Sequence, residues 1–151
     1  MKLYNTEGAL IPDVQDALYE LCNAGTGMVS ITIGHLLNTR ITISTPEVMS
    51  EEPETLKLVD MAQDQEVVFF VMHMKETMSG DVAFVLSKDL ILEAVCKMTQ
   101  TSYTFDEMFR DKEGLSALQE FGNIIGSAYV KAIGEYTGMR FFLSPVLVGL
   151  E

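Results

Sequence analysis

The stretch DALYELCNAGTG, residues 16–27, has the apolar spacing of an amphipathic helix, and SALQEFGNIIGS, residues 116–127, repeats it. In both copies polar residues stand at positions i, i+4 and i+7: Asp16, Glu20 and Asn23; Ser116, Glu120 and Asn123. An ungapped comparison of residues 16–45 with 116–145 finds further identities: Ala17/Ala117, Leu18/Leu118, Ile33/Ile133, Gly34/Gly134, Arg40/Arg140 and Ser44/Ser144. The chain is therefore predicted to contain an internal repeat with a period of about 100 residues.

The repeated polar residues form a stripe along each predicted helix, opposite its apolar side. Stripe 1 and stripe 2 are, in order: Asp16, Glu20, Asn23 and Gly27; Ser116, Glu120, Asn123 and Ser127. The apolar sides are: Val14, Ala17, Leu18, Leu21 and Met28; Ala117, Leu118, Phe121, Ile125 and Ala128. A polar face is ordinary for an amphipathic helix. Here it is repeated, and neither glutamate has the Lys or Arg three or four residues away that usually stabilises an exposed face.

The composition is that of a single soluble domain. The chain has 151 residues, of which 48% are apolar, and this is enough for a sizeable core. The net charge of -12, from 22 acidic residues against 10 Lys and Arg, repels nucleic acid and anionic lipid. No signal peptide or apolar run of about 18 residues is recognisable, so we expect a cytoplasmic protein without membrane insertion. Cys22 and Cys96 are expected to be buried, reduced thiols.

The hydrophobic pattern predicts seven helices and strands. They are a long helix at about 13–37, strands at 40–45, 66–74 and 81–87, a helix capped by Ser87, a second long helix at about 115–136, and a strand at 140–149. The acidic stretch 47–65 is expected to be mostly loop, and Ser79-Gly80 to turn a hairpin. Gly25, on the inner side of the first helix, is explained equally well by close packing between helix and sheet and by a role in binding.

This order predicts one α/β (α+β) domain over residues 1–151. Two long motif helices should pack on a mostly antiparallel sheet, with pseudo-two-fold symmetry. The first half of the repeat is expected at about 13–99 and the second, shorter half at about 114–151.

The two stripes resemble the signature D/S-x-x-x-E-x-x-N-x(22)-P of the CheC/CheX/FliY family, whose members dephosphorylate the chemotaxis response regulator CheY. Stripe 1 matches it with Pro46, which follows Asn23 after 22 residues. Stripe 2 matches it with Pro145, with one residue fewer before the proline. Two copies of the motif make the chain most similar to CheC. A CheC-type chain continues with a further hairpin and helix, so the resemblance is to a C-terminally short form.

The resemblance implies a phosphatase that hydrolyses the aspartyl phosphate of a phosphorylated CheY-type response regulator. Asn23 and Asn123 would orient the attacking water, and Glu20 and Glu120 would pair with the regulator's lysine. The remaining stripe residues would contact the partner: Asp16, Gly27, Ser116 and Ser127. The Mg²⁺ ion belongs to the regulator, so no cofactor or metal site of the chain's own is expected.

One alternative function accompanies this reading. A non-catalytic adaptor would use the same helix faces to bind a receiver, a CheD-like deamidase or a flagellar switch component. The glutamate and asparagine in both copies favour the enzyme.

The predicted strand 140–149 favours self-association, because an apolar strand at a sheet edge invites another chain to pair with it. We therefore expect a homodimer formed through this edge, or else a monomer in which residues 1–10 cover it.

Overall fold

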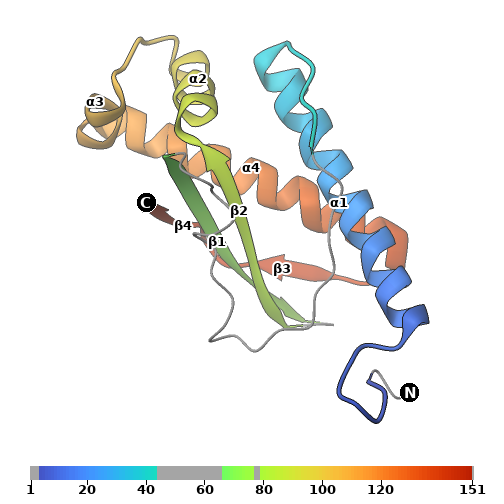
Figure 1. Cartoon of the computed structure of the whole chain (residues 1–151). Coiled ribbons are helices and arrows are strands. Elements are labelled where there is room, and N and C mark those ends of the chain that lie inside the picture. Colours follow the sequence, from blue (N-terminus) through green and yellow to red (C-terminus); the bar gives the residue numbers. More distant parts are fainter. Residues whose placement is uncertain (1–3, 44–65, 77–78, 151) are drawn as a thin grey trace.

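The computed structural model describes residues 4–43, 66–76 and 79–150 (Figure 1). Within these ranges the helices are α1 (Pro12–Leu37), α2 (Lys88–Thr99), α3 (Phe105–Arg110) and α4 (Lys112–Thr137). The strands are β1 (Val67–Glu76), β2 (Gly80–Ser87), β3 (Phe141–Leu143) and β4 (Leu147–Leu150). The strands form one antiparallel sheet, so the predicted α+β class is confirmed.

Strand β1 is the centre of the sheet. Along one side it pairs with β2, from Val67 opposite Ser87 to Met74 opposite Gly80, as the predicted hairpin requires. Its other side pairs with β3 near Met74 and with β4 near Val68. The first half of the chain therefore supplies the central strand to which strands from both halves are hydrogen-bonded.

The single strand predicted at 140–149 is wrong, because the structure divides it into β3 and β4. Ser144 keeps the chain attached to β1 at the break: its backbone N–H donates to the carbonyl of His73 at 2.8 Å, and its hydroxyl accepts from the N–H of His73 at 2.9 Å. Pro145 follows and has no N–H to donate, so regular pairing stops there and resumes at Leu147.

The strand predicted at 40–45 is also wrong over the described residues 40–43, which form no strand. The carbonyl of Ile41 instead accepts a hydrogen bond from the Ser30 hydroxyl at 2.7 Å, so this segment is bound to α1. The alternating apolar residues had indicated a half-buried surface, but a helix covers it in place of a neighbouring strand. Residues 44–45, Pro46 and the acidic stretch 47–65 lie outside the described residues.

The two long motif helices have the same length and the same kind of C-terminus. Each has 26 residues, and each ends at a residue in the left-handed conformation, Asn38 for α1 and Gly138 for α4. The bounds predicted for the first long helix, about 13–37, are confirmed within one residue. Helix α4 begins three residues before its predicted start, because the Asp111 side chain accepts a hydrogen bond from the Gly114 N–H at 2.8 Å and caps the helix.

Helix α4 runs across one face of the sheet (Figure 1) and approaches it through glycines. A Cβ atom on Gly122 would clash with Phe70 of β1, and one on Gly126 would clash with Met72. Phe121 packs edge-on against Phe70, with ring centroids 6.0 Å apart. The fully buried side chains of this core come from β1 and from the helices: Ile33, Val68, Phe70, Met72, Ile91, Val95, Met108, Leu118, Phe121 and Ile125.

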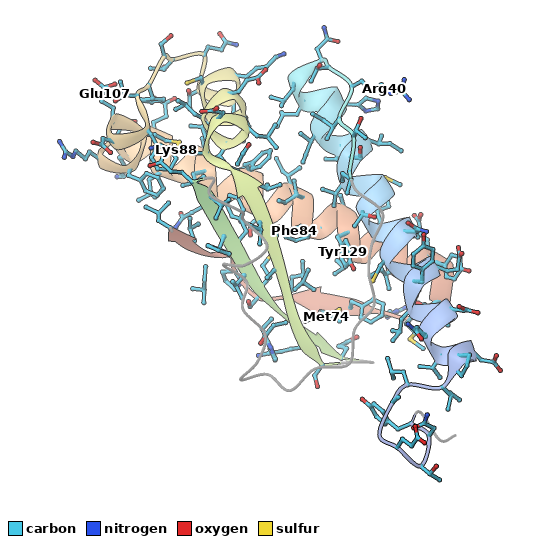
Figure 2. The ribbon with its side chains drawn as sticks, in the orientation of Figure 1. Arg40, Met74, Phe84, Lys88, Glu107 and Tyr129 are labelled. Carbon is cyan, nitrogen blue, oxygen red and sulfur yellow. The ribbon has the colours of Figure 1, made fainter. Side chains whose placement is uncertain are left out.

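Helix α1 packs chiefly on α4. Gly25 is buried against the Tyr129 ring, so of its two explanations close packing holds, but the packing is between two helices and not between helix and sheet. Tyr129 also meets Phe84 of β2 edge-on, at 5.6 Å between centroids (Figure 2), and its hydroxyl lies 3.9 Å from the Cys22 sulfur. Burial, more than the nearby thiol, raises the pKa of Tyr129, so it stays a neutral hydroxyl. Tyr129 thus joins α1, α4 and the sheet.

The polar segment before α4 contains a short helix, α3, that the sequence pattern missed. Thr104 and Glu107 form a capping box: the threonine hydroxyl accepts from the Glu107 N–H, and the glutamate accepts from the Thr104 N–H at 2.7 Å. Met108, fully buried, anchors α3 to the core. The Tyr103 hydroxyl donates to the Asp111 carboxylate at 2.9 Å and links the start of α3 to the start of α4.

The edge formed by β3 and β4 is apolar and exposed. Phe142 is 60% exposed, Leu147 70% and Leu150 51%. Residues 4–10 form a turn ahead of α1, closed by a bridge between Tyr4 and Leu10, and they leave these three side chains exposed. Residues 1–3 lie outside the described residues. The homodimer stays a prediction. We expect sedimentation equilibrium to give twice the monomer mass of 16.8 kDa, and Phe142→Lys to return the protein to the monomer. A wild-type monomer at every micromolar concentration would exclude this dimer.

Candidate functional site

The predicted stripe residues lie on the outer faces of the two long helices. Six of them are exposed: Asp16, Glu20, Gly27, Ser116, Glu120 and Ser127. Asn23 and Asn123 are half-buried, which restricts where their amides can point. Ala17, expected on the inner side, is exposed, because the first turns of α1 extend past the core and the buried positions of α1 begin at Gly25.

The structure does not bring the two stripes together into one site. Helices α1 and α4 meet through Gly25 and Tyr129, and these residues lie on the inner faces, away from the stripes. Each stripe is therefore a separate surface with its own glutamate and asparagine. Neither asparagine amide makes a hydrogen bond to any part of the chain that the structure describes, so both amides are available to another molecule.

A hollow of about 680 Å³ adjoins stripe 2, between the end of α2 and the start of α4. Its lining residues are Met98, Thr99, Asp111, Lys112, Glu113, Ser116, Ala117 and Glu120. Lys112 stands one turn before Ser116 and gives stripe 2 a cation, whereas the equivalent position before stripe 1 is Pro12. The two stripes therefore differ in charge at their N-terminal ends.

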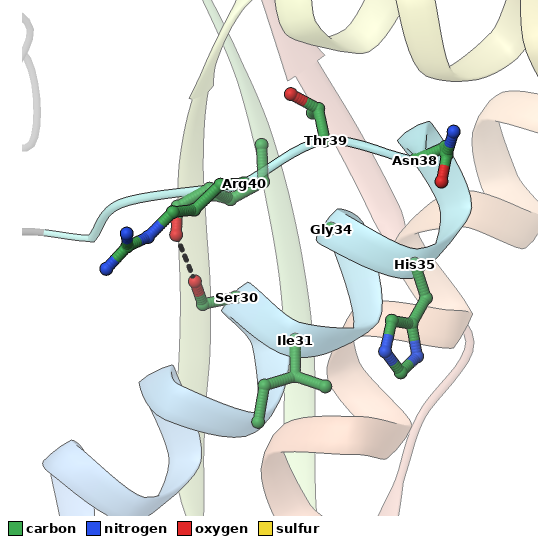
Figure 3. A pocket seen from close by; sticks show the side chains of 8 residues that line it. Ser30, Ile31, Gly34, His35, Asn38, Thr39 and Arg40 are labelled. Carbon is green, nitrogen blue, oxygen red and sulfur yellow. Dashed lines mark hydrogen bonds between the residues drawn. The ribbon is translucent and has the colours of Figure 1, made fainter.

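Two further grooves occupy equivalent places in the repeat. Groove 1, about 700 Å³, lies between the last turns of α1 and the chain that returns after it (Figure 3). Groove 3, about 460 Å³, lies between the last turns of α4 and the chain leading into β3. Six equivalent pairs line both grooves: Ser30/Val130, Ile31/Lys131, Gly34/Gly134, Thr39/Met139, Arg40/Arg140 and Ile41/Phe141. The sequence held a signal for them, because Gly34 and Arg40 recur as Gly134 and Arg140.

The Asp111 carboxylate supports the stripe 2 hollow and should make stability depend on pH. Hydrogen bonds from the Gly114 N–H and then the Tyr103 hydroxyl lower its pKa below the ordinary 3.8. Its stabilising effect is therefore present above 3.8 and is lost as the pH falls through the lower pKa of the folded state. We expect Asp111→Asn to lower the melting temperature at neutral pH, and the difference from wild type to shrink below about pH 4.

Melts followed by circular dichroism at several pH values measure this difference. Asparagine is itself a good N-cap, so the variant removes the charge and keeps the cap. Asp106→Asn is a matched control, because Asp106 is exposed and accepts no side-chain hydrogen bond in the described part of the chain. A difference for Asp111→Asn that stays constant down to pH 2 would contradict the assignment.

In the described residues, no three His, Cys, Asp or Glu side chains lie close enough together to hold a metal ion. His35 is exposed, and the His73 ring lies 2.8 Å from the Asp81 carboxylate on the neighbouring strand. Among the same residues, no helix is both long and apolar enough to cross a membrane. Cys22 and Cys96 are free thiols, but they are half-buried where full burial was expected.

The fold and the two stripes define an α+β protein with a duplicated helix-borne surface. The chain is 25% identical over 144 residues to the CheY-P phosphatase CheC of Bacillus subtilis, covering 90% of this chain and 66% of that protein. Its fold is similar to Thermotoga maritima FliY, with a TM-score of 0.68, 24% identity, and coverage of 95% and 71% of the two chains.

A second solved structure with a similar fold is the complex of CheX with CheY, BeF₃ and Mg²⁺ from Borrelia burgdorferi. The TM-score is 0.58 with 16% identity, covering 86% of this chain and 76% of that chain. No family model matches the chain. The CheC relative confirms the resemblance predicted from the two motifs, and the two solved structures confirm the fold.

Proposed function

We propose that the protein is a chemotaxis phosphatase that hydrolyses the aspartyl phosphate of a phosphorylated CheY-type response regulator in the cytoplasm. The observation that carries this proposal is the pair of stripes: each presents an exposed glutamate and, one turn away, an asparagine amide without a partner in the described chain. The CheC relative is by name a CheY-P phosphatase, and the CheX neighbour was solved with CheY, which supports the same class of partner.

The chemistry suits these residue types. Hydrolysis of an acyl phosphate needs a water molecule in line with phosphorus, and positioning it provides much of the acceleration. The amide of Asn23 or Asn123 both donates and accepts hydrogen bonds, so it can orient the water without bringing negative charge near the phosphoryl oxygens. Because each asparagine residue is half-buried, its side chain has less freedom to lose when the water is bound.

The glutamates have a different role in this proposal. Glu20 and Glu120 are exposed one turn before the asparagines and make no ion pair with the described chain, so each is available to a cation on the partner. A lysine of the regulator would be that cation, and the pair would set the register in which the asparagine enters the regulator's site. The regulator supplies the Mg²⁺ that neutralises phosphoryl charge.

The experiment follows the loss of acyl phosphate from a phosphorylated CheY-type receiver, with and without the protein. Faster loss that saturates with receiver concentration supports the phosphatase. Binding of the receiver without faster loss would indicate the non-catalytic adaptor instead, and binding only to a CheD-like deamidase would indicate that partner. If the protein neither speeds the loss of acyl phosphate nor binds the receiver, the receiver is excluded as its partner.

A further inference from the structure

We infer that Arg40 and Arg140 form a second contact with the receiver, in which each guanidinium binds a carboxylate of the partner at the far end of its stripe. This inference rests on the proposed function and adds positioning residues to it. The contact uses grooves 1 and 3, which the repeat places identically with respect to the two stripes.

The grooves continue the stripes along the helix surface. At about 100° per residue, Gly27, Ile31 and Gly34 lie in the same sector of α1 as Glu20 and Asn23. Groove 3 is itself lined by Ser127, the last residue of stripe 2. Ile31 is 53% exposed, so the continuation faces outward. A partner that lies along a stripe therefore also covers the adjoining groove.

The position of each arginine is determined by the helix end. After the left-handed residues Asn38 and Gly138, the chain turns back over the helix. A Cβ atom on Gly34 would lie 2.9 Å from the Thr39 carbonyl oxygen, and one on Gly134 would lie 3.0 Å from that of Met139. Only glycine lets the returning chain pass this close. Each arginine follows directly and lines its groove.

On the α1 side, two neighbouring contacts support this end of the helix. The Lys97 ammonium of α2 donates a hydrogen bond to the carbonyl of Leu37, the last residue of α1. The Ser30 hydroxyl holds the carbonyl of Ile41, the residue after Arg40. Figure 3 shows the Arg40 side chain at the side of the groove, reaching away from Ile31 and His35. The chain is therefore held before and after Arg40, and Arg40 itself is exposed.

Distance and charge set what the proposed receiver must offer to meet both contacts. From Glu20 to Gly34 the helix rises about 21 Å, which is within the roughly 30 Å width of a small domain such as a receiver. In both copies an exposed glutamate lies at the stripe end and an exposed arginine lines the groove end. A complementary receiver surface therefore has a lysine at one end and an Asp or Glu at the other, which the planar guanidinium binds through two parallel hydrogen bonds.

The test isolates one site at a time. Arg40→Glu is made in an Asn123→Ala background, so that only stripe 1 acts, and Arg140→Glu is made in an Asn23→Ala background. We expect KM for the phosphorylated receiver to rise about tenfold in each case, with kcat little changed and the effect largest at low salt. Glu20→Gln serves as the reference for loss of the contact between the glutamate and the regulator's lysine. Arg40→Lys keeps the positive charge, so its KM should lie between those of Arg40 and Arg40→Glu.

Arg110→Glu is the matched control, since Arg110 is an exposed arginine of α3 that lines neither groove. Circular dichroism melts check that the variants fold. If Arg40→Glu or Arg140→Glu unfolds, Arg40→Gln or Arg140→Gln replaces it. Unchanged KM in both backgrounds, with wild-type activity intact, overturns this inference and leaves the phosphatase standing. No acceleration by the wild-type protein overturns the phosphatase and this inference with it. A fall in kcat alone also overturns it, because the arginine would then act in the chemistry.

Discussion

The Asn23→Ala, Asn123→Ala double variant is expected to lose at least about 100-fold of its rate of acyl-phosphate hydrolysis, because it has no amide left to orient the water. Each single variant should keep the activity of the other stripe, since the two stripes are separate surfaces of α1 and α4. The measurement is the single-turnover loss of phosphate from a phosphorylated receiver at saturating protein. A double variant that works at the wild-type rate would remove the asparagines from the mechanism.

A control separates this effect from unfolding. Gln119 is also an exposed amide on α4 but lies off the stripe, so Gln119→Ala should leave the rate unchanged. The asparagines are half-buried and unbonded to the described chain, so their replacement should change the free energy of unfolding by no more than about 0.5 kcal/mol. A large drop in melting temperature with the loss of rate would instead mean that the asparagines support the helices.

Phe121→Ala is expected to lower the free energy of unfolding by about 3 to 5 kcal/mol, the range found when a fully buried aromatic residue is truncated. Phe121 has no exposed surface, and its ring contacts Phe70 of the central strand. Removing it leaves a cavity between α4 and β1. Helix α4 cannot move inward to fill it, because Gly122 and Gly126 already hold the helix in close contact with β1. Urea unfolding followed by circular dichroism measures the change.

Tyr136→Ala, on the same helix, is the matched control for this truncation. Tyr136 is 60% exposed, so its loss should change stability by about 0.5 kcal/mol or less. A loss below about 1 kcal/mol for Phe121→Ala would mean that α4 collapses onto the sheet without strain.

The long helices, the hairpin and the two stripes could be predicted because each depends on a local period in the sequence. Helix α1 showed its apolar spacing, and β1 and β2 showed continuous apolar runs bounded by a turn. The same reasoning could not say what covers a given apolar side. Ala17 has the spacing of the apolar side but is exposed. Residues 40–43 alternate like a strand, but the Ser30 hydroxyl binds this segment to α1.

The other misses have equally particular causes. Helix α3 is only six residues long in a polar segment, although Thr104 followed by Glu107 was a readable capping box. The division of β3 from β4 depends on the hydrogen bonds between Ser144 and His73 across the sheet, which are tertiary contacts. The grooves needed the folded backbone, because only there do Arg40 and Arg140 take equivalent places at the ends of the stripes.

The central position of β1 affects how the two copies of the motif can diverge. Strands from both halves are hydrogen-bonded to β1, and α4 packs across it, so a substitution inside this strand is felt by the supports of both stripes at once. A substitution on a stripe is felt by one copy alone. The duplicated protein thus has a shared skeleton and two independently adjustable faces. The two copies already differ on these faces, with Asp16 in one and Ser116 in the other, and with Pro12 in one and Lys112 in the other.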